Sequence, residues 1–417
     1  MTTRIPLPRL IGRRAILLLA IIILVCVAAY RARPPASLTI ETGPVGGSYH
    51  QVALQYRDAL AKHGITVNVV PKPNSMEIIK DVADPNTDVD VGFIAQDVRG
   101  MAGEAIATIG KIQLQPLFIF ASADLGRRST MDDLRGKRIV MPPEESATSV
   151  AAVSVLALYD ITADNTSFTF MPLTKAAAQL QEEKFDAGVF MLAPENPTIK
   201  ALASDSSLRL MPYTEARAVA NHLPFLRQVI LPRGIYNIAD SIPPYDTPLV
   251  AATVGVVVRD NLHPYLIYSL LEAMTVLHRP PTFLSGAGEF PTLAGAQLTT
   301  HPLAMSYYKS GLPWAYRDLP PWLASMVDAY DTHGLALLLI AAVFVFIGPI
   351  ADMLAAACEV VALAIIGRVD RGVSRTGRLS NLQRNLLGVA EAILQRVATN
   401  HIGERVIADI RTRADQA

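Results

Sequence analysis

Residue types that support catalysis are scarce in this chain. Ser306 and Lys309 fit the S-x-x-K spacing, in which a lysine can activate a serine, but the companion S-D-N and K-T-G elements are absent. The eight histidines lack metal-ligand spacing, and the sequence contains no H-E-x-x-H, G-x-S-x-G or phosphate-binding-loop motif. We therefore expect a binding protein and not an enzyme, without metal or cofactor, and with Ser306 on a packed helix face.

Polar residues gather where predicted strands pass into predicted helices. At a helix start, free N–H groups and the positive end of the helix dipole can hold an anionic group such as a carboxylate. The same serines can be ordinary helix caps, so each junction alone has two interpretations, but several junctions together favour a ligand cleft. The candidate ligand-binding residues are Gly47, Ser48, Tyr49, Asn74, Ser75, Gln96, Asp97, Ser146, Thr148 and Ser149.

This hypothesis makes two demands on the fold. Deleting the side chains of Ser48 and Tyr49 should abolish solute binding. In addition, Ser48 and Ser146 must face a shared gap. The hypothesis fails if the domain has a single continuous core with these two serines on opposite outer surfaces.

Alternating strands and helices must position these junctions. From Ser37 onward, short apolar or β-branched runs alternate with helical stretches, a pattern typical of βαβ units and mainly parallel sheets. The expected strands are 38–43, 65–70, 89–95, 114–121, 138–141, 168–171, 187–191 and 249–258, and the expected helices are 52–60, 76–82, 146–159 and 176–182.

The order of these elements predicts an α/β fold with two lobes in residues 37–333. The long run 249–258 is expected to return the chain to the first lobe. Lobe one then comprises 37–120 and 250–310, and lobe two comprises 121–249. The ligand should lie in the cleft between them, near the carboxyl ends of the strands.

The net charge of zero hides an uneven distribution along the chain. Residues 1–33 hold six Arg and no acid, residues 37–333 hold 22 Lys+Arg against 30 Asp+Glu, and residues 368–417 hold nine Arg against five acids. Basic flanks around an acidic middle are what the positive-inside rule expects when both ends are cytoplasmic and the middle is exported. An acidic middle domain also argues against nucleic acid as a partner.

Two apolar runs are candidate membrane segments. Residues 15–30, within an N-terminal segment 1–36, read as a signal anchor, with a cleaved signal peptide as the alternative. Residues 335–351, within a segment 334–367, form the stronger transmembrane candidate. The stretch 353–366 suggests a surface helix or the tail of a tilted one; alternatively, Asp352 and Glu359 share a helix face that docks a membrane partner.

The tail, residues 368–417, contains apolar residues three and four apart between 379 and 397, which predicts an amphipathic helix. With its arginines, this helix suits an anionic inner leaflet or a helical partner, and a solubilising tail is the alternative. Cys26 and Cys358 lie in separate hydrophobic segments, so we expect no disulfide between them.

The middle of the chain resembles the TAXI group of solute receptors of TRAP (tripartite ATP-independent periplasmic) transporters over residues 38–328. The motifs that carry the resemblance are Thr42-Gly43, Gly46-Gly47-Ser48-Tyr49, Asn74-Ser75-Met76-Glu77, Gln96-Asp97, Ser146-Ala147-Thr148, Phe185-Asp186-Ala187, His301-Pro302-Leu303-Ala304, Tyr307-Tyr308 and Leu319-Pro320-Pro321-Trp322-Leu323. The resemblance implies a type II periplasmic-binding-protein fold. Such a fold closes around a small organic anion, often an amino acid such as glutamate or a dicarboxylate, and delivers it to a permease.

Together these features predict a membrane-tethered solute receptor of the bacterial cytoplasmic membrane, with its large domain outside and both termini in the cytoplasm. Because both ends are fixed, TRAP permease subunits would have to sit beside it in the membrane. The alternative is an envelope regulatory or structural protein that keeps the fold without ligand transport. The absence of a thermal shift with any of a broad metabolite panel would favour that alternative.

Overall fold

The computed structural model of the protein describes residues 26–95, 105–125, 130–329, 357–371 and 380–397, together with positions 23, 354–355, 408 and 411–412. The chain divides into two compact units. Arg33–Ser325 form one unit, and Met1–Ala32 with Met326–Ala417 form the other.

The larger unit is built on a ten-stranded sheet. Its central order is β2-β1-β3-β10-β4-β7-β5-β6, with β8 paired to β4 and β9 paired to β10. The strands are β1 (Ser37–Thr42), β2 (Thr66–Pro71), β3 (Val91–Ile94), β4 (Ile106–Ser122), β5 (Arg138–Met141), β6 (Ser167–Phe170), β7 (Ala187–Met191), β8 (Leu208–Leu210), β9 (Leu226–Leu231) and β10 (Thr247–Arg259).

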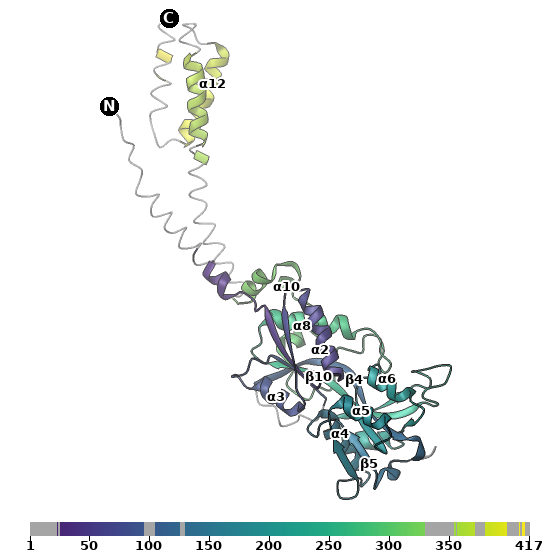
Figure 1. Cartoon of the computed structure of the whole chain (residues 1–417). Helices are drawn as coiled ribbons and strands as arrows, with labels where there is room; N and C mark the ends of the chain where they lie inside the picture. Colours follow the sequence, from purple (N-terminus) through teal and green to yellow (C-terminus); the bar gives the residue numbers. More distant parts are fainter. Residues whose placement is uncertain are drawn as a thin grey trace. The chain divides into compact units, whose positions relative to one another are not determined.

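Helices pack on the strands at both ends of the sheet. We call β1, β2, β3 and the helices on them the β1 half, and β5, β6, β7 and their helices the β5 half. In the β1 half, α2 packs beside α8, while α4 and α5 flank the β5 half (Figure 1). The helices of this unit include α2 (Ser48–Ala61), α3 (Ser75–Ala83), α4 (Ala147–Ala157), α5 (Leu173–Gln181), α6 (Pro197–Ser204), α7 (Ala216–His222), α8 (Pro264–His278), α9 (Pro302–Ser310) and α10 (Trp314–Asp318).

Strand direction differs from the expected one. β1 runs parallel to β2 and β3, and β5 runs parallel to β6 and β7, but β4 and β10 are antiparallel to every named strand that they pair with. The prediction of mainly parallel sheets is therefore wrong. The two long strands carry the chain between the halves, so they run against the strands that alternate with helices.

The predicted return of the chain at 249–258 is confirmed. β10 pairs with β3 of the β1 half through residues Val258↔Val91 to Gly255↔Ile94, and along its length with β4. The lobe boundaries themselves stay predictions. What the strand order establishes is that β10 and β4 lie between the two parallel half-sheets.

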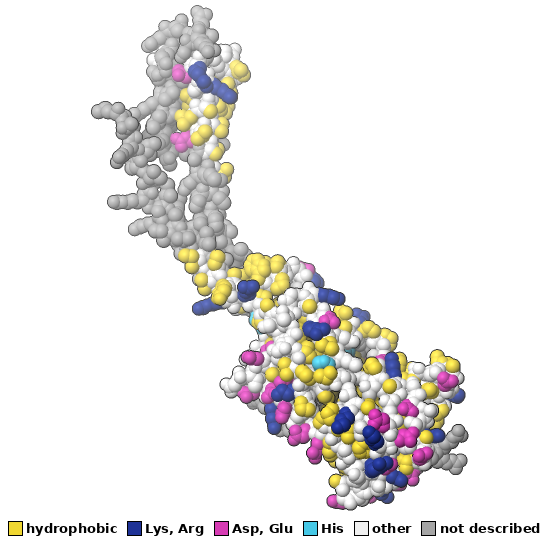
Figure 2. All heavy atoms as spheres, in the orientation of Figure 1, with side chains coloured by type: hydrophobic (Ala, Val, Ile, Leu, Met, Phe, Trp, Pro, Cys, Tyr) yellow, Lys and Arg dark blue, Asp and Glu magenta, His cyan; other side chains and the backbone are white. Residues whose placement is uncertain are grey.

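The core of the larger unit is continuous across both halves. Tyr56 and Phe93 of the β1 half belong to the same buried cluster as Phe118 and Phe190 on the other side of β10. Strand β4 is buried along most of its length, which includes the stretch 106–113 that the sequence pattern missed. On the face that Figure 2 shows, acidic and basic side chains of this unit are interspersed, and no basic stripe runs across its described residues.

The second unit contains a pair of packed helices. Residues 357–371 are helical, and α12 (Asn381–Val397) confirms the amphipathic helix expected in the tail. Ala362, Ile366 and Val369 form a small core with Leu387, Ala390 and Leu394. The apolar face of α12 thus has a helical partner within its own chain.

Among the residues that the structure describes, none of the helices has both the length and the apolar character needed to span a bilayer. The predicted segment 335–351 and most of 15–30 lie outside the described residues. Cys26 and Cys358 are exposed free thiols.

Candidate functional site

Two strand-to-helix junctions, one from each half, share the same turn. After β1, the Gly47 N–H donates to the Pro44 carbonyl at 2.9 Å, and α2 begins at the next residue. After β5, the Ser146 N–H donates to the Pro143 carbonyl, also at 2.9 Å, and α4 follows. Proline fixes φ near −65°, which favours such turns ahead of a helix.

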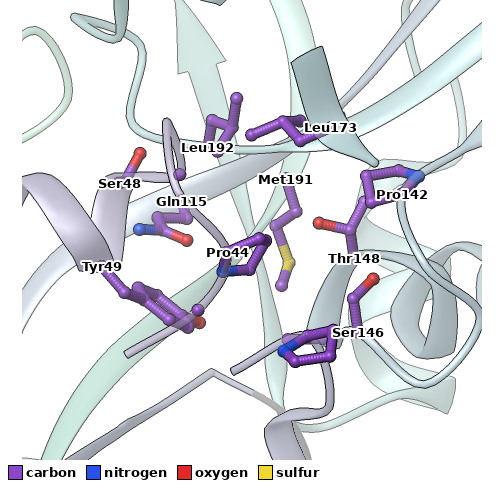
Figure 3. Close-up of a pocket in the computed structure, with 14 residues that line it drawn as sticks. Pro44, Ser48, Tyr49, Gln115, Pro142, Ser146, Thr148, Leu173, Met191 and Leu192 are labelled. Carbon is purple, nitrogen blue, oxygen red and sulfur yellow. The ribbon is translucent and has the colours of Figure 1, made fainter. Parts of the chain in front are cut away.

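Both junctions open onto one pocket. Ser48 and Ser146 line it together, so they do not lie on opposite surfaces (Figure 3). The lining residues that the structure describes carry no formal charge; they are Gly43, Pro44, Gly47, Ser48, Tyr49, Pro73, Gln115, Pro142, Ser146, Ala147, Thr148, Leu173, Met191 and Leu192.

The helix starts supply backbone donors to this pocket. Gly47 caps α2 without a side-chain bond, and the N–H groups of Ser48 and Tyr49 have no hydrogen-bond partner within the described chain. In α4 the N–H groups of Ala147 and Thr148 are likewise unpaired among described residues. Unpaired first-turn N–H groups at the positive ends of two helix dipoles favour an anionic or strongly hydrogen-bond-accepting group between them.

Two buried side chains add donors that are unused inside the protein. Tyr49 is 7% exposed and Gln115 is 2% exposed. The Tyr49 hydroxyl and Gln115 Nε2 find no hydrogen-bond partner among the described residues. Burial raises the pKa of the Tyr49 hydroxyl, which therefore stays protonated and able to donate. Leaving a buried donor unpaired costs about 1–3 kcal/mol, so both groups are suited to an acceptor on a bound molecule.

The opposite wall comes from the β5 half. Figure 3 shows Thr148 and Ser146 across the pocket from Gln115 and Tyr49, with the Met191 side chain between them. Thr148 is 8% exposed, and no described group hydrogen-bonds to its hydroxyl. Leu173 and Leu192 complete an apolar wall. The pocket thus combines a few convergent donors with apolar contact surface, as small-molecule sites do.

The Ser48 hydroxyl has partners within the protein. It accepts from the Ala193 N–H at 2.8 Å and lies 3.4 Å from Asn196 Nδ2. Both partners come from the β7–α6 connection of the β5 half. Among the described contacts, this serine joins the halves.

Ser146 and Ser149 serve the start of α4. The Ser146 hydroxyl accepts from the Ser149 N–H at 3.3 Å, which makes Ser146 a helix cap. The Ser149 hydroxyl donates to the Pro142 carbonyl at 2.8 Å, and its side chain is fully buried behind the lining residues. The cap interpretation therefore describes Ser146, and the Ser149 side chain anchors the start of α4 to the Pro142 carbonyl.

Among the remaining candidates, Asn74 is not one of the residues that line the pocket. Asn74 caps α3 by accepting from the Met76 N–H at 2.8 Å, and its amide donates to Glu145 of the β5 half. Ser75 is the first residue of α3. Gln96 and Asp97 lie outside the described residues.

Gln115 is the site residue that the sequence pattern missed. It lies in the interior of β4, where no helix junction draws attention to it. A signal was present, because Gln113 and Gln115 stand two residues apart in a largely apolar run and so share a face of the strand. Buried glutamines in such a strand require partners.

The pocket is narrow. It leaves about 40 Å³ for the centres of water-sized molecules, and about 10–15 Å³ is enough for one water. Little room is therefore left for a solute as large as an amino acid when the halves are in this arrangement.

A family model described as NMT1-like matches residues 40–309. The chain belongs to the NMT1-like family. In keeping with the prediction, the α/β fold of this NMT1-like protein is periplasmic-binding-protein-like.

Solved structures with partial likeness include three bacterial proteins. The alkanesulfonate-binding protein SsuA from Xanthomonas axonopodis pv. citri, bound to MOPS, is 16% identical over 52% of this chain and 66% of its own, with a TM-score of 0.33. Holo ArgBP from T. maritima is 14% identical over 59% of this chain and 92% of its own, with a TM-score of 0.37. A protein from Bordetella bronchiseptica RB50 is 13% identical over 72% and 99%, with a TM-score of 0.42. At these identities and TM-scores, none of their ligands transfers to this chain.

Proposed function

We propose that this NMT1-like protein is an extracytoplasmic receptor that closes its two halves on a small solute carrying a carboxylate. The observation that carries the proposal is a pair of buried, unpartnered donors, the Tyr49 hydroxyl and Gln115 Nε2, on side chains that line the pocket where two helices begin. A carboxylate is a good acceptor for such donors, because it offers two oxygens and about four lone-pair sites.

Because the described lining residues are uncharged, the pocket can stabilise only a limited negative charge on a bound solute. No Lys or Arg is among the described lining residues, so only helix starts and neutral donors offset the charge of a solute. A helix start contributes about 0.3–1 kcal/mol, and up to ~2 kcal/mol when partly buried. One carboxylate suits this arrangement better than several, and the apolar wall of Met191, Leu173 and Leu192 suits a short carbon chain.

We further propose that the receptor is tethered to the bacterial cytoplasmic membrane and serves TRAP-type permease subunits. The arginine-rich flanks and the apolar run 335–351 support a tether, with the large unit outside and both termini in the cytoplasm. A receptor held in this way would hand its solute to a neighbour in the same membrane.

The proposal is tested by purifying the full chain gently and identifying co-purified small molecules by mass spectrometry. We expect a carboxylate-bearing metabolite that also raises the melting temperature when added back, because a ligand that binds only the folded state stabilises it. If nothing co-purifies and no member of a broad metabolite panel shifts the melting temperature, the rival function applies, namely an envelope regulatory or structural protein.

A further inference from the structure

The β7–α6 connection reaches from the β5 half to the start of α2 in the β1 half. Its Ala193 N–H donates to the Ser48 hydroxyl at 2.8 Å. Asn196 Nδ2 donates to the Gly46 carbonyl at 3.2 Å and to the Ser48 hydroxyl at 3.4 Å. Ser48 is 3% exposed and Asn196 is 2% exposed, so these bonds are shielded from water.

The orientation of the Asn196 amide is fixed by a second bond. Asn196 Oδ1 accepts from the Thr198 N–H at 2.9 Å and caps α6. Because the oxygen is used by the cap, the Nδ2 end must point away from α6, toward Gly46 and Ser48. The Asn196 side chain thus caps α6 in the β5 half and also hydrogen-bonds to the β1 half.

Glu195 of the same connection and Lys200 of α6 also contact the loop that follows α8. Glu195 Oε1 accepts from the Phe283 N–H at 2.7 Å, and Lys200 Nζ lies 5.7 Å from the Phe283 ring centroid. Phe283 follows α8, which packs beside α2. The contacts around Asn196 are therefore part of a wider junction between the halves.

We infer that the Ser48 hydroxyl, the Ala193 N–H and the Asn196 side chain form a clasp that holds the two halves together. We further infer that the Ser48 hydroxyl influences solute affinity through closure and not by touching the solute. Because the pocket is narrow, we expect the halves to separate before a solute enters, so the clasp would open and re-form in each binding cycle. Loss of one buried hydrogen bond shifts the equilibrium between open and closed forms about fivefold toward the open form.

The clasp is tested without any solute by measuring the distance between the halves. Spin labels are placed on the purified full chain at Lys62→Cys in the β1 half and Lys184→Cys in the β5 half, with Cys26→Ser and Cys358→Ser. Distance distributions are compared for this parent, for Asn196→Ser and for Ser48→Ala. Serine at 196 keeps an oxygen that can cap α6 but loses the longer amide group that donates to Gly46 and Ser48. Ser48→Ala leaves the Gly47 cap of α2 in place.

Ser154→Ala is the matched control, because its hydroxyl bonds only to the Val150 carbonyl of its own helix. We expect Asn196→Ser and Ser48→Ala to add longer distances and Ser154→Ala to match the parent. Distributions of both clasp variants that superimpose on the parent would overturn the inference.

A second arm, which rests on the proposed function, uses calorimetry with the co-purified solute. If both side chains act on affinity through closure, each variant should weaken solute binding by a similar factor, up to about fivefold. The two variants are Ser48→Ala and Asn196→Ser. A far larger loss for Ser48→Ala than for Asn196→Ser would mean that Ser48 touches the solute, and would overturn the second half of the inference. If no solute is found, the proposed function fails while the distance measurement still decides the clasp.

Discussion

Tyr49 and Thr148 illustrate how single residues define the pocket. Each lies in the first turn of a helix, Tyr49 in α2 and Thr148 in α4, and each presents a hydroxyl that no described residue uses. The two hydroxyls come from different halves. A solute that bonds to both would favour the closed form, because it cannot keep both bonds when the halves part.

Replacing Thr148 with valine removes the hydroxyl and keeps the shape of the side chain. We expect the affinity for the co-purified solute to fall about fivefold, the usual worth of one neutral hydrogen bond, with the melting temperature of the solute-free chain nearly unchanged. Isothermal titration calorimetry measures the first quantity and differential scanning calorimetry the second. An unchanged affinity would exclude the Thr148 hydroxyl from the site.

Glu41 is a buried acid next to the pocket-forming turn. It is 3% exposed on β1, and Lys72 Nζ lies 3.6 Å from its carboxylate while pairing more closely, at 2.9 Å, with Asp81. Burial, and next the charge of Asp81, raise the pKa of Glu41 to about 7, although Lys72 acts in the opposite direction. The folded protein therefore holds a proton that the unfolded chain releases at lower pH.

This raised pKa predicts a pH-dependent effect of Glu41→Gln. Between about pH 4.5 and 7 the folded state binds more protons at Glu41 than the unfolded state, so this group's contribution to stability falls as the pH rises through that window. Glutamine resembles the protonated acid and does not titrate. The melting temperature of Glu41→Gln relative to wild type should therefore rise from pH 5 to pH 8, and a difference that stays flat or falls would contradict the assignment.

At the scale of elements, glycines allow helices to pack closely on the sheet. A Cβ on Gly92 of β3 would lie 2.6 Å from Ile78 Cγ2 and 3.2 Å from Val82 Cγ2 of α3. In the β5 half, a Cβ on Gly188 of β7 would lie 2.7 Å from Leu180 Cδ2 of α5. Each half therefore relies on one small residue where a helix crosses a buried strand.

Gly92→Ala should destabilise the larger unit by about 1–3 kcal/mol, because the extra methyl group forces α3 away from β3. Denaturant unfolding of the full chain measures this loss. Gly286→Ala is the control, since no atom lies within 4 Å of its added Cβ and its φ is not positive. Equal stability of the two variants would refute the packing argument.

The sequence predicted elements best where a short apolar strand is followed by a helix. Strands β5 and β7 have the predicted bounds, and α4 differs by one or two residues at each end. The sequence pattern did not predict the stretch 106–113 of β4. Gly110, Lys111 and Gln113 interrupt the apolar pattern there, although most of the strand is buried. The sequence pattern also failed for strand direction, since antiparallel pairing of β4 and β10 depends on contacts between residues more than 100 positions apart.

The candidate site was predictable only in part, for a related reason. Junction residues such as Tyr49 and Thr148 are visible in sequence because a helix start requires polar groups. Gln115 comes from a strand interior and Asn196 from a loop of the β5 half. Only the fold brings Gln115 to the pocket and Asn196 to Ser48. Whether Ser48 bonds to a solute or to Asn196 likewise depends on tertiary contacts that local patterns do not encode.

At the scale of the whole molecule, two halves of one unit share the pocket described above. Its donors come from α2, α4 and β4, and its apolar wall from α5 and the end of β7. The buried core runs without interruption from one half to the other, so we expect that the halves would open at the pocket while the strands β4 and β10 stay paired. Solute binding would then be a change of closure and not of fold.

The most direct test of this account is calorimetric titration of the co-purified solute into the full chain and into the double variant Tyr49→Phe, Gln115→Ala. Phenylalanine keeps the buried ring and alanine keeps the strand, so the variant loses mainly the two unpartnered donors. We predict measurable binding to the wild type and a loss of about 25-fold or more in the variant, since two donors at about fivefold each are removed. An unchanged affinity would contradict the assignment of this pocket as the solute site.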